Sequence, residues 1–105
     1  MKSETYLVTA YTAGYESTQK HKGEKGYGIT ASGATVKENH TIACAKSLEF
    51  GTQIYIPELN NVYECQDRGS KIRNNHIDIY MENLDDALAF GKQKLEVKVL
   101  PNRED

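Results

Sequence analysis

The sequence lacks the features that mark several common classes of protein. It has only two cysteines, Cys44 and Cys65, and without a second pair nearby they do not form a metal finger. No apolar run approaches the length needed to cross a membrane. Neither charge is in large excess, since 13 basic and 15 acidic residues give a net charge of -2. We therefore expect no membrane insertion and no general attraction to nucleic acid.

The first residues also lack the apolar core of a signal peptide and lead directly into a strand pattern. On this basis we expect no export signal in the chain itself, which suggests an excised domain or a phage-encoded protein. A length of 105 residues allows one domain, covering residues 1–105. With 38% hydrophobic and 27% charged residues, the composition is that of a globular chain and not of a disordered one.

The two cysteines have two interpretations. Each lies in an apolar, strand-like stretch, and buried free cysteines behave as small hydrophobic side chains. They could also form a disulfide if their strands adjoin. We favour free thiols in the core and keep the disulfide as the alternative.

Short stretches rich in β-branched and aromatic residues recur along the chain and predict strands. These stretches are residues 5–11, 41–44, 53–57, 62–67, 77–80 and 95–100. One late helix is predicted at 84–90, with Asn83 as its N-cap and Gly91 as its stop, and a single helical turn at 46–51. The pattern indicates a mainly β protein, a small closed barrel with one or two short helices. The long segment 12–27 is predicted to be a surface loop that can grip a substrate.

Two aspartates in the stretch 66–80 are the candidates for chemistry. Asp78 stands between two isoleucines in a predicted strand, so alternation places its carboxylate on the face opposite to theirs. Burying an unpaired carboxylate there would be costly, which favours a function. Asp67 ends the strand 62–67, on the face of Tyr63 and Cys65, although Asp-Arg-Gly-Ser is also an ordinary turn sequence.

Cations accompany the two aspartates. Arg68, Lys71 and Arg73 form either a solvated face or, beside two carboxylates, a site for an anionic or polar ligand. A metal site built from Asp67, His76 and Asp78 is the weaker alternative, because no ligand spacing enforces it. We expect no metal and no cofactor.

Eight short motifs occur in a fixed order along the chain. They are Thr9-Ala10-Tyr11-Thr12-Ala13-Gly14, Gly26-Tyr27-Gly28-Ile29-Thr30-Ala31-Ser32-Gly33, Thr41-Ile42-Ala43, Phe50-Gly51-Thr52, Ile54-Tyr55-Ile56-Pro57, Gln66-Asp67-Arg68-Gly69, Ile77-Asp78-Ile79-Tyr80 and Ala87-Leu88-Ala89-Phe90-Gly91. In this order they resemble the three-aspartate (3D) domain family, which is related to the barrel of membrane-bound lytic transglycosylase A. The resemblance covers about residues 8–100.

The resemblance implies a six-stranded double-psi β-barrel that binds the glycan strands of peptidoglycan at the bacterial cell wall. It implies lytic transglycosylation: cleavage of the β-1,4 bond between N-acetylmuramic acid and N-acetylglucosamine, with a 1,6-anhydro-muramyl product. We expect a monomer. The chain departs from the family pattern where the first aspartate is expected, which here is Cys44-Ala45-Lys46, and at Arg68, where threonine is usual.

By the same resemblance, Asp67 and Asp78 are the second and third family aspartates and the catalytic pair. Asp78 is the acid/base, and its apolar neighbours and the charge of Asp67 are expected to raise its pKa. The predicted substrate-binding residues are Thr9, Tyr11, Thr30, Ser32, Arg68 and Tyr80.

Two other functions compete with this one. In an inverting glycoside hydrolase, Asp67 would activate a water and Asp78 would protonate the leaving group, with roughly 6.5 to 9.5 Å between the carboxyl groups. In a non-catalytic glycan-binding or structural module, such as one in a phage particle, the missing first aspartate would mark lost activity.

Overall fold

Six strands close into a barrel in the computed structural model, which describes residues 3–14 and 26–101. The strands are β1 (Ser3–Tyr11), β2 (Thr41–Ala43), β3 (Gln53–Ile56), β4 (Asn61–Asp67), β5 (His76–Tyr80) and β6 (Gln93–Val99). A 3-10 turn η1 (Pro57–Leu59) and one helix α2 (Leu84–Phe90) complete the regular elements of the described residues. The mainly β barrel predicted from the sequence is confirmed.

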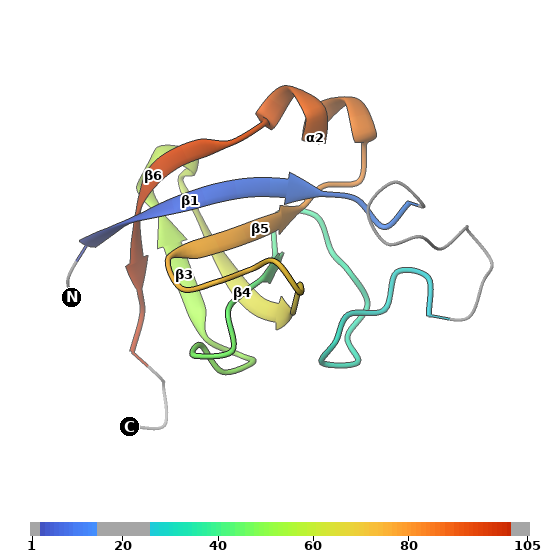
Figure 1. The fold of residues 1–105 in the computed structure, drawn as a ribbon, viewed down its shortest axis with the longest axis horizontal. Helices are drawn as coiled ribbons and strands as arrows, with labels where there is room; N and C mark the ends of the chain where they lie inside the picture. Colours follow the sequence, from blue (N-terminus) through green and yellow to red (C-terminus); the bar gives the residue numbers. More distant parts are fainter. Residues whose placement is uncertain (1–2, 15–25, 102–105) are drawn as a thin grey trace.

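The order of strands around the barrel is β1-β5-β2-β4-β3-β6. Two neighbouring pairs, β1 with β5 and β2 with β4, are parallel, and the other pairs are antiparallel. Figure 1 shows β1 and β5 running side by side, with α2 lying over one end of this pair. The parallel register sets Thr9 opposite Asp78 and Tyr11 opposite Tyr80. Residues far apart in the sequence therefore meet at these two strands.

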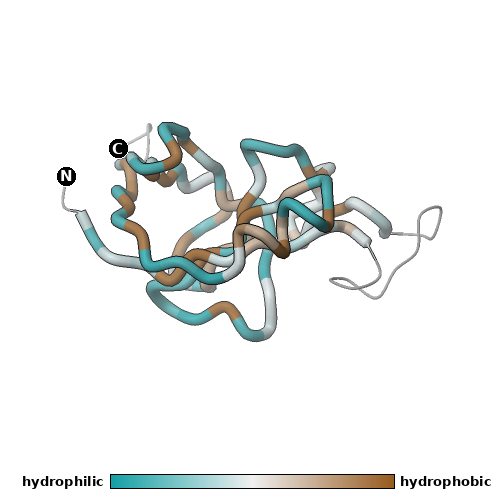
Figure 2. The backbone as a smooth tube through the Cα atoms, turned by 90° about the horizontal axis from the view of Figure 1, so that it is seen from above, coloured by the Kyte–Doolittle hydropathy of each residue, from teal (hydrophilic) through white to brown (hydrophobic). Residues whose placement is uncertain are grey.

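The core follows the period-two pattern of the strands. Val8, Ile42, Ile54, Ile77 and Val97 are fully buried inside the barrel. Hydrophobic and hydrophilic positions alternate along the strands in Figure 2. Since Ile77 and Ile79 both point into this core, Asp78 between them is directed to the outer face, as alternation predicts.

The local signals for α2 are also confirmed. The Asn83 side chain accepts hydrogen bonds from the backbone N–H groups of Asp85 (2.7 Å) and Asp86 (3.2 Å), and Gly91 ends the helix. The predicted helical turn at 46–51 is wrong. This segment has two separate tight turns: the Leu48 N–H bonds the Ala45 carbonyl at 3.0 Å, and the Thr52 N–H bonds the Glu49 carbonyl at 3.1 Å.

The prediction of free cysteines is also wrong: Cys44 and Cys65 form a disulfide, with an S–S distance of 2.05 Å. Cys44 directly follows β2, and Cys65 lies on β4. β2 and β4 are parallel neighbours, so the Cα atoms of Cys44 and Cys65 lie 5.6 Å apart, which is within the range that a disulfide spans. The two strands lie far apart in the sequence, so the spacing of the cysteines did not reveal their pairing.

A β-bulge interrupts β4 close to its end. Ile42 of β2 pairs with Cys65, but the next residue, Ala43, pairs with Asp67, so Gln66 is an extra residue. Tyr63 and Cys65 point into the core, whereas the Asp67 carboxylate meets the outer face of β1. The bulge therefore overturns the prediction that these three side chains share a face.

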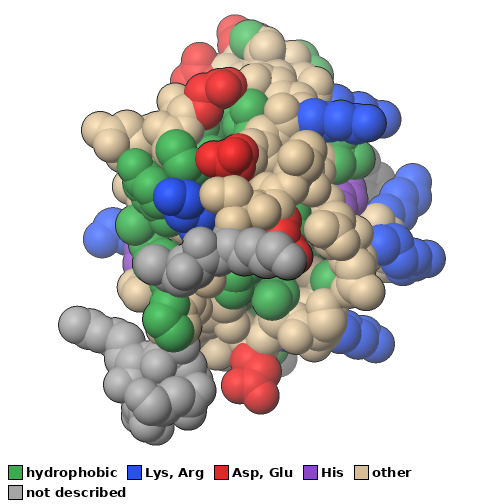
Figure 3. Space-filling model, turned by 90° about the vertical axis from the view of Figure 1, so that its left-hand side faces the viewer, with side chains coloured by type: hydrophobic (Ala, Val, Ile, Leu, Met, Phe, Trp, Pro, Cys, Tyr) green, Lys and Arg blue, Asp and Glu red, His purple; other side chains and the backbone are tan. Residues whose placement is uncertain are grey.

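Side chains of both charges, with hydrophobic ones between them, occupy the face drawn in Figure 3. Among the described residues, α2 and η1 are far too short to span a bilayer, and no other helix does so. Most of the predicted loop 12–27, residues 15–25, lies outside the described residues.

Candidate functional site

A hollow of about 290 Å³ on the outside of the barrel is lined by residues of the neighbouring strands β1, β5, β2 and β4. Both predicted catalytic aspartates, Asp67 and Asp78, line it, together with Tyr11 and Arg68. Glycines and small apolar side chains from the segments after β1 and before β2 form the rest of its wall. The topology thus brings the two carboxylates to one concave surface.

Asp78 reaches this hollow from the middle of β5. The Thr9 hydroxyl on β1 donates a hydrogen bond to its Oδ1 at 2.9 Å. Burial raises the pKa of Asp78 from its ordinary 3.8 to about 6; the Thr9 hydrogen bond lowers it, and the negative charge of Asp67 raises it. Apolar surroundings and a like charge were the causes expected from the sequence. A carboxyl group with this pKa can hold a proton close to neutral pH.

Asp67 is held by three donors. The Tyr11 hydroxyl donates to Oδ2 at 2.8 Å, and the backbone N–H groups of Ala31 and Arg68 each donate to Oδ1 at 2.9 Å. A carboxylate has acceptor capacity for about four hydrogen bonds, so most of it is used here. The three contacts fix the orientation of Asp67 at the rim of the hollow.

Tyr11 links the two aspartates electrostatically. Burial raises the pKa of its hydroxyl, and the charges of Asp67 and Asp78 raise it further, so the hydroxyl remains a neutral donor. Its ring meets the edge of the Tyr80 ring, with 5.8 Å between the centroids. Tyr80 itself is 7% exposed and does not line the hollow, although we predicted that it binds substrate.

The segment 28–36 forms the wall opposite β5. The Ser32 N–H donates to the Gln66 carbonyl at 3.1 Å, next to the bond from Ala31 to Asp67. The hydroxyls of Thr30 and Ser32 bond each other at 3.0 Å, and Thr30 also accepts from the Ala34 N–H at 3.1 Å. Neither Thr30 nor Ser32 lines the hollow, although we predicted that they bind substrate; their bonds hold this segment together and against β4.

A family model for the 3D domain matches residues 40–101. The chain belongs to the 3D domain family. This segment runs from β2 through β6 and includes both candidate aspartates.

Solved structures show the same fold for this 3D domain. MltA from E. coli aligns with a TM-score of 0.57 and 19% identity, covering 70% of this chain and 27% of the MltA chain. An alanine variant of the E. coli lytic transglycosylase MltA, in its apo-2 form, aligns with a TM-score of 0.53 and 17% identity, covering 70% and 28% of the two chains. The chain thus spans little more than a quarter of the MltA chains. No curated protein matches it. The predicted six-stranded double-psi β-barrel is confirmed.

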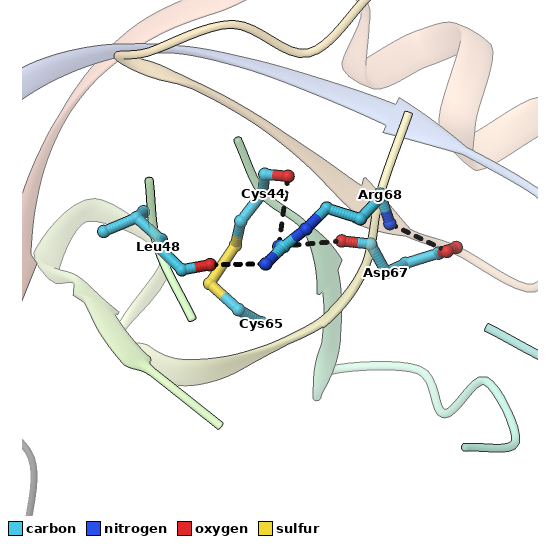
Figure 4. Close-up of a disulfide and its surroundings, with 5 residues drawn as sticks. All are labelled: Cys44, Leu48, Cys65, Asp67 and Arg68. Atoms are coloured by element: carbon cyan, nitrogen blue, oxygen red, sulfur yellow. Dashed lines mark hydrogen bonds between the residues drawn. A yellow bond between two sulfur atoms is a disulfide. The ribbon is translucent and has the colours of Figure 1, made fainter. Parts of the chain in front are cut away.

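The two departures from the expected family pattern lie in contact in this 3D domain. Arg68 donates to the carbonyl oxygens of Cys44 (3.3 Å) and Leu48 (2.7 Å), and Figure 4 shows its guanidinium beside the disulfide. The guanidinium also stacks on the Phe50 ring, 4.1 Å from its centroid. Arg68 therefore ties segment 44–50 to the end of β4 at the edge of the hollow.

A second hollow, of about 650 Å³, adjoins the first and shares Arg68 and Gly69 with it. Lys46 and Arg73 also line this second hollow, and among the described residues no acidic side chain does. The two hollows together form one continuous surface, which carries the two aspartates at one end and basic side chains at the other.

The sequence reasoning missed His76, which it considered only as a weak metal ligand that precedes a strand. His76 is the first residue of β5, is half-buried, and places Nε2 at 2.9 Å from the Thr9 hydroxyl oxygen. Burial lowers its pKa. The signal that could have identified it is its position two residues before Asp78, on the same face of the strand. Within the described residues no three His, Cys, Asp or Glu side chains are grouped as metal ligands would be.

Proposed function

We propose that this 3D domain is a lytic transglycosylase of peptidoglycan. It cleaves the β-1,4 bond between N-acetylmuramic acid and N-acetylglucosamine and leaves a 1,6-anhydro-muramyl end. The observation that carries the proposal is Asp78, a carboxyl group with a pKa of about 6 that lines a hollow beside a second carboxylate. Family membership and the fold shared with MltA, a lytic transglycosylase by name, support it.

Asp78 serves both steps of the proposed reaction. In its protonated form it gives its proton to the departing glycosidic oxygen as an oxocarbenium-like centre forms at the muramic acid. The Asp78 carboxylate then takes the proton of the 6-hydroxyl of the same sugar, which attacks the anomeric carbon and closes the anhydro ring. The carboxyl group begins and ends protonated, so one acid is sufficient and no water is consumed.

Asp67 supports this chemistry with its charge. It helps to raise the pKa of Asp78, and its negative charge favours the positive centre that develops on the sugar. Since three donors already occupy most of its acceptor capacity, activation of a water by Asp67, as in an inverting hydrolase, is less well supported.

The two adjoining hollows accommodate the glycan strand in this proposal. Tyr11 and Arg68 line the first hollow directly. Thr9 contributes through Asp78, and Thr30 and Ser32 contribute indirectly, by holding the segment that carries Gly28, Ile29 and Val36 of the wall. The proposed reaction uses no metal and no cofactor. In this proposal the protein acts at the bacterial cell wall, as a monomer.

Digestion of purified peptidoglycan, followed by mass spectrometry, tests the proposal. The native protein should release fragments with anhydromuramyl ends, and Asp78→Asn should release none. Asp85→Asn is the matched control, because Asp85 lies in the first turn of α2 and does not line the hollow. Reducing ends would instead indicate hydrolysis. An intact wall with all three proteins, together with binding to it, would favour a glycan-binding module.

A further inference from the structure

The hydroxyl of Thr9 lies between two titratable side chains of β5. Its oxygen is 2.9 Å from Asp78 Oδ1 and 2.9 Å from His76 Nε2, whereas its next acceptor, the Ile77 carbonyl, is at 3.4 Å. The parallel pairing of β1 with β5 sets Thr9 opposite Asp78, and His76 lies two residues earlier on the same face. The three side chains form a continuous chain of hydrogen bonds that ends at the hollow.

A hydroxyl has one proton, so Thr9 can donate to only one of its two partners. When Thr9 donates to an ionised Asp78, Nε2 of His76 must have a hydrogen and donate to Thr9. When Thr9 donates to a bare Nε2, Asp78 must be protonated and donate to Thr9. The protonation of Asp78 is therefore coupled to that of His76 Nε2.

The bond that Thr9 donates to Asp78 is the first arrangement, and it lowers the pKa of Asp78. The surroundings of His76 oppose it by favouring the second arrangement, in which His76 Nε2 competes for the Thr9 hydrogen. Burial and the charge of Lys92 oppose the imidazolium ion, and together they outweigh a hydrogen bond to the Lys71 backbone that favours it. A neutral ring has one proton, and with that proton on the nitrogen that bonds the Lys71 backbone, Nε2 is bare beside Thr9. A bare Nε2 is satisfied by Thr9 only while Asp78 is protonated.

We propose that His76 is a positioning residue that acts through Thr9 to favour and align the acid form of Asp78. As Asp78 gives its proton to the glycosidic oxygen, the Thr9 hydroxyl turns its hydrogen from His76 to the new carboxylate. Thr9 and His76 neither gain nor lose a proton in this step. When Asp78 recovers a proton, the hydroxyl turns back. The role in catalysis rests on the proposed function, but the coupling itself does not.

The test measures the titration of Asp78 directly, by the ¹³C chemical shift of its carboxyl group in the protein without substrate. His76→Leu frees Thr9 to donate to Asp78 at every pH, so the titration midpoint should fall by about half to one pH unit, the equivalent of one hydrogen bond. His76→Gln keeps an acceptor for Thr9 and should restore most of the original value. His40→Leu is the matched control, because His40 contacts Glu64 and not this chain.

The groups that also face these two residues must remain constant in the test. Asp67 and Tyr11 face Asp78, and Lys92 faces His76. Because none of them is changed, a shift can be assigned to the hydrogen-bond chain. In a Thr9→Val background the connecting hydroxyl is absent, and His76→Leu should then produce no further shift.

An unchanged midpoint in His76→Leu would overturn the proposal, and so would an equal shift in the Thr9→Val background. A rise of the midpoint would overturn it too, because His76 would then be acting as a positive charge. If the digests show anhydro ends, the rate of cleavage should also be measured against pH. The midpoint of its alkaline limb should then lie at a lower pH in His76→Leu, by the same amount as the titration midpoint. If the digests show no cleavage, the titration still decides the coupling.

Discussion

Replacing Asp78 by asparagine is expected to stabilise the protein at neutral pH, although it removes the proposed acid. Folding moves the Asp78 carboxyl group into a mostly buried position, where its pKa rises from 3.8 to about 6. The folded state therefore binds the proton more tightly than the unfolded state does. The stability gained from this proton is fully present below about pH 3.8 and is lost as the pH rises to about 6.

The magnitude follows from the size of the shift. A difference of about two pKa units corresponds to about 3 kcal/mol, since each unit is worth 1.36 kcal/mol. Asparagine has a similar shape and is neutral at every pH. Above about pH 7, Asp78→Asn should therefore be about 3 kcal/mol more stable than the native protein, and near pH 3.5 the two should be equal.

Urea unfolding of both proteins at intervals between pH 3.5 and 8 provides the measurement, with the disulfide left intact. The difference in the free energy of unfolding should grow through the window from pH 4 to 6 and then become constant. Asp85→Asn serves as the control, because it removes the same charge from the first turn of α2, where aspartate is favourable. A difference that does not vary with pH, or a variant less stable than the native protein at pH 7, would refute the reasoning.

Three other changes test the contacts around the hollow. Replacing both Cys44 and Cys65 by alanine removes the disulfide that closes a loop with a sequence separation of 21 residues. The free energy of unfolding in guanidinium should fall by about 3 kcal/mol. Equal unfolding midpoints for the native protein with and without reductant would contradict this. Asp67→Asn should destabilise the protein by about 1–3 kcal/mol at pH 7, opposite in sign to the change at Asp78, because Tyr11 loses its acceptor. Arg68→Lys should lower the stability of the folded state by about 1–2 kcal/mol, measured by thermal unfolding. The reason is that lysine has no planar group that can bond two carbonyl oxygens and stack on an aromatic ring at once. An unchanged Tm would show that these contacts contribute little.

Local patterns were sufficient to predict most of the elements. The alternation around Ile77 and Ile79 identified both the strand and the outward direction of Asp78, because strand periodicity depends only on neighbouring residues. The N-cap at Asn83 and the stop at Gly91 likewise act within one turn of the helix. Such features are predictable from the sequence because the interactions that create them are local.

The features that were missed depend on contacts between distant segments. The disulfide requires β2 and β4 to be neighbours, and the bulge at Gln66 appears only when their register is known. The role of His76 depends on Thr9, which is 67 residues away in the sequence. The position of His76 two residues before Asp78 marks it as a candidate, but only the contact with Thr9 distinguishes it from a solvated ring.

The contacts of Arg68 explain how the barrel tolerates the absence of the first family aspartate. That aspartate is expected where Cys44-Ala45-Lys46 stands. Cys44 is bound to β4 by the disulfide to Cys65 and by its N–H, which donates to the Asp67 carbonyl at 3.1 Å, and its own carbonyl accepts from the Arg68 guanidinium just after β4. The two departures from the family pattern are thus partners in one contact. Together they hold the segment after β2 against β4, while Asp67 and Asp78 keep their places in the hollow. These contacts replace whatever support a carboxylate would give to this segment. Arg68→Thr, which restores the usual family residue, should loosen segment 44–50 and leave the titration of Asp78 unchanged, because Arg68 does not contact that carboxyl group.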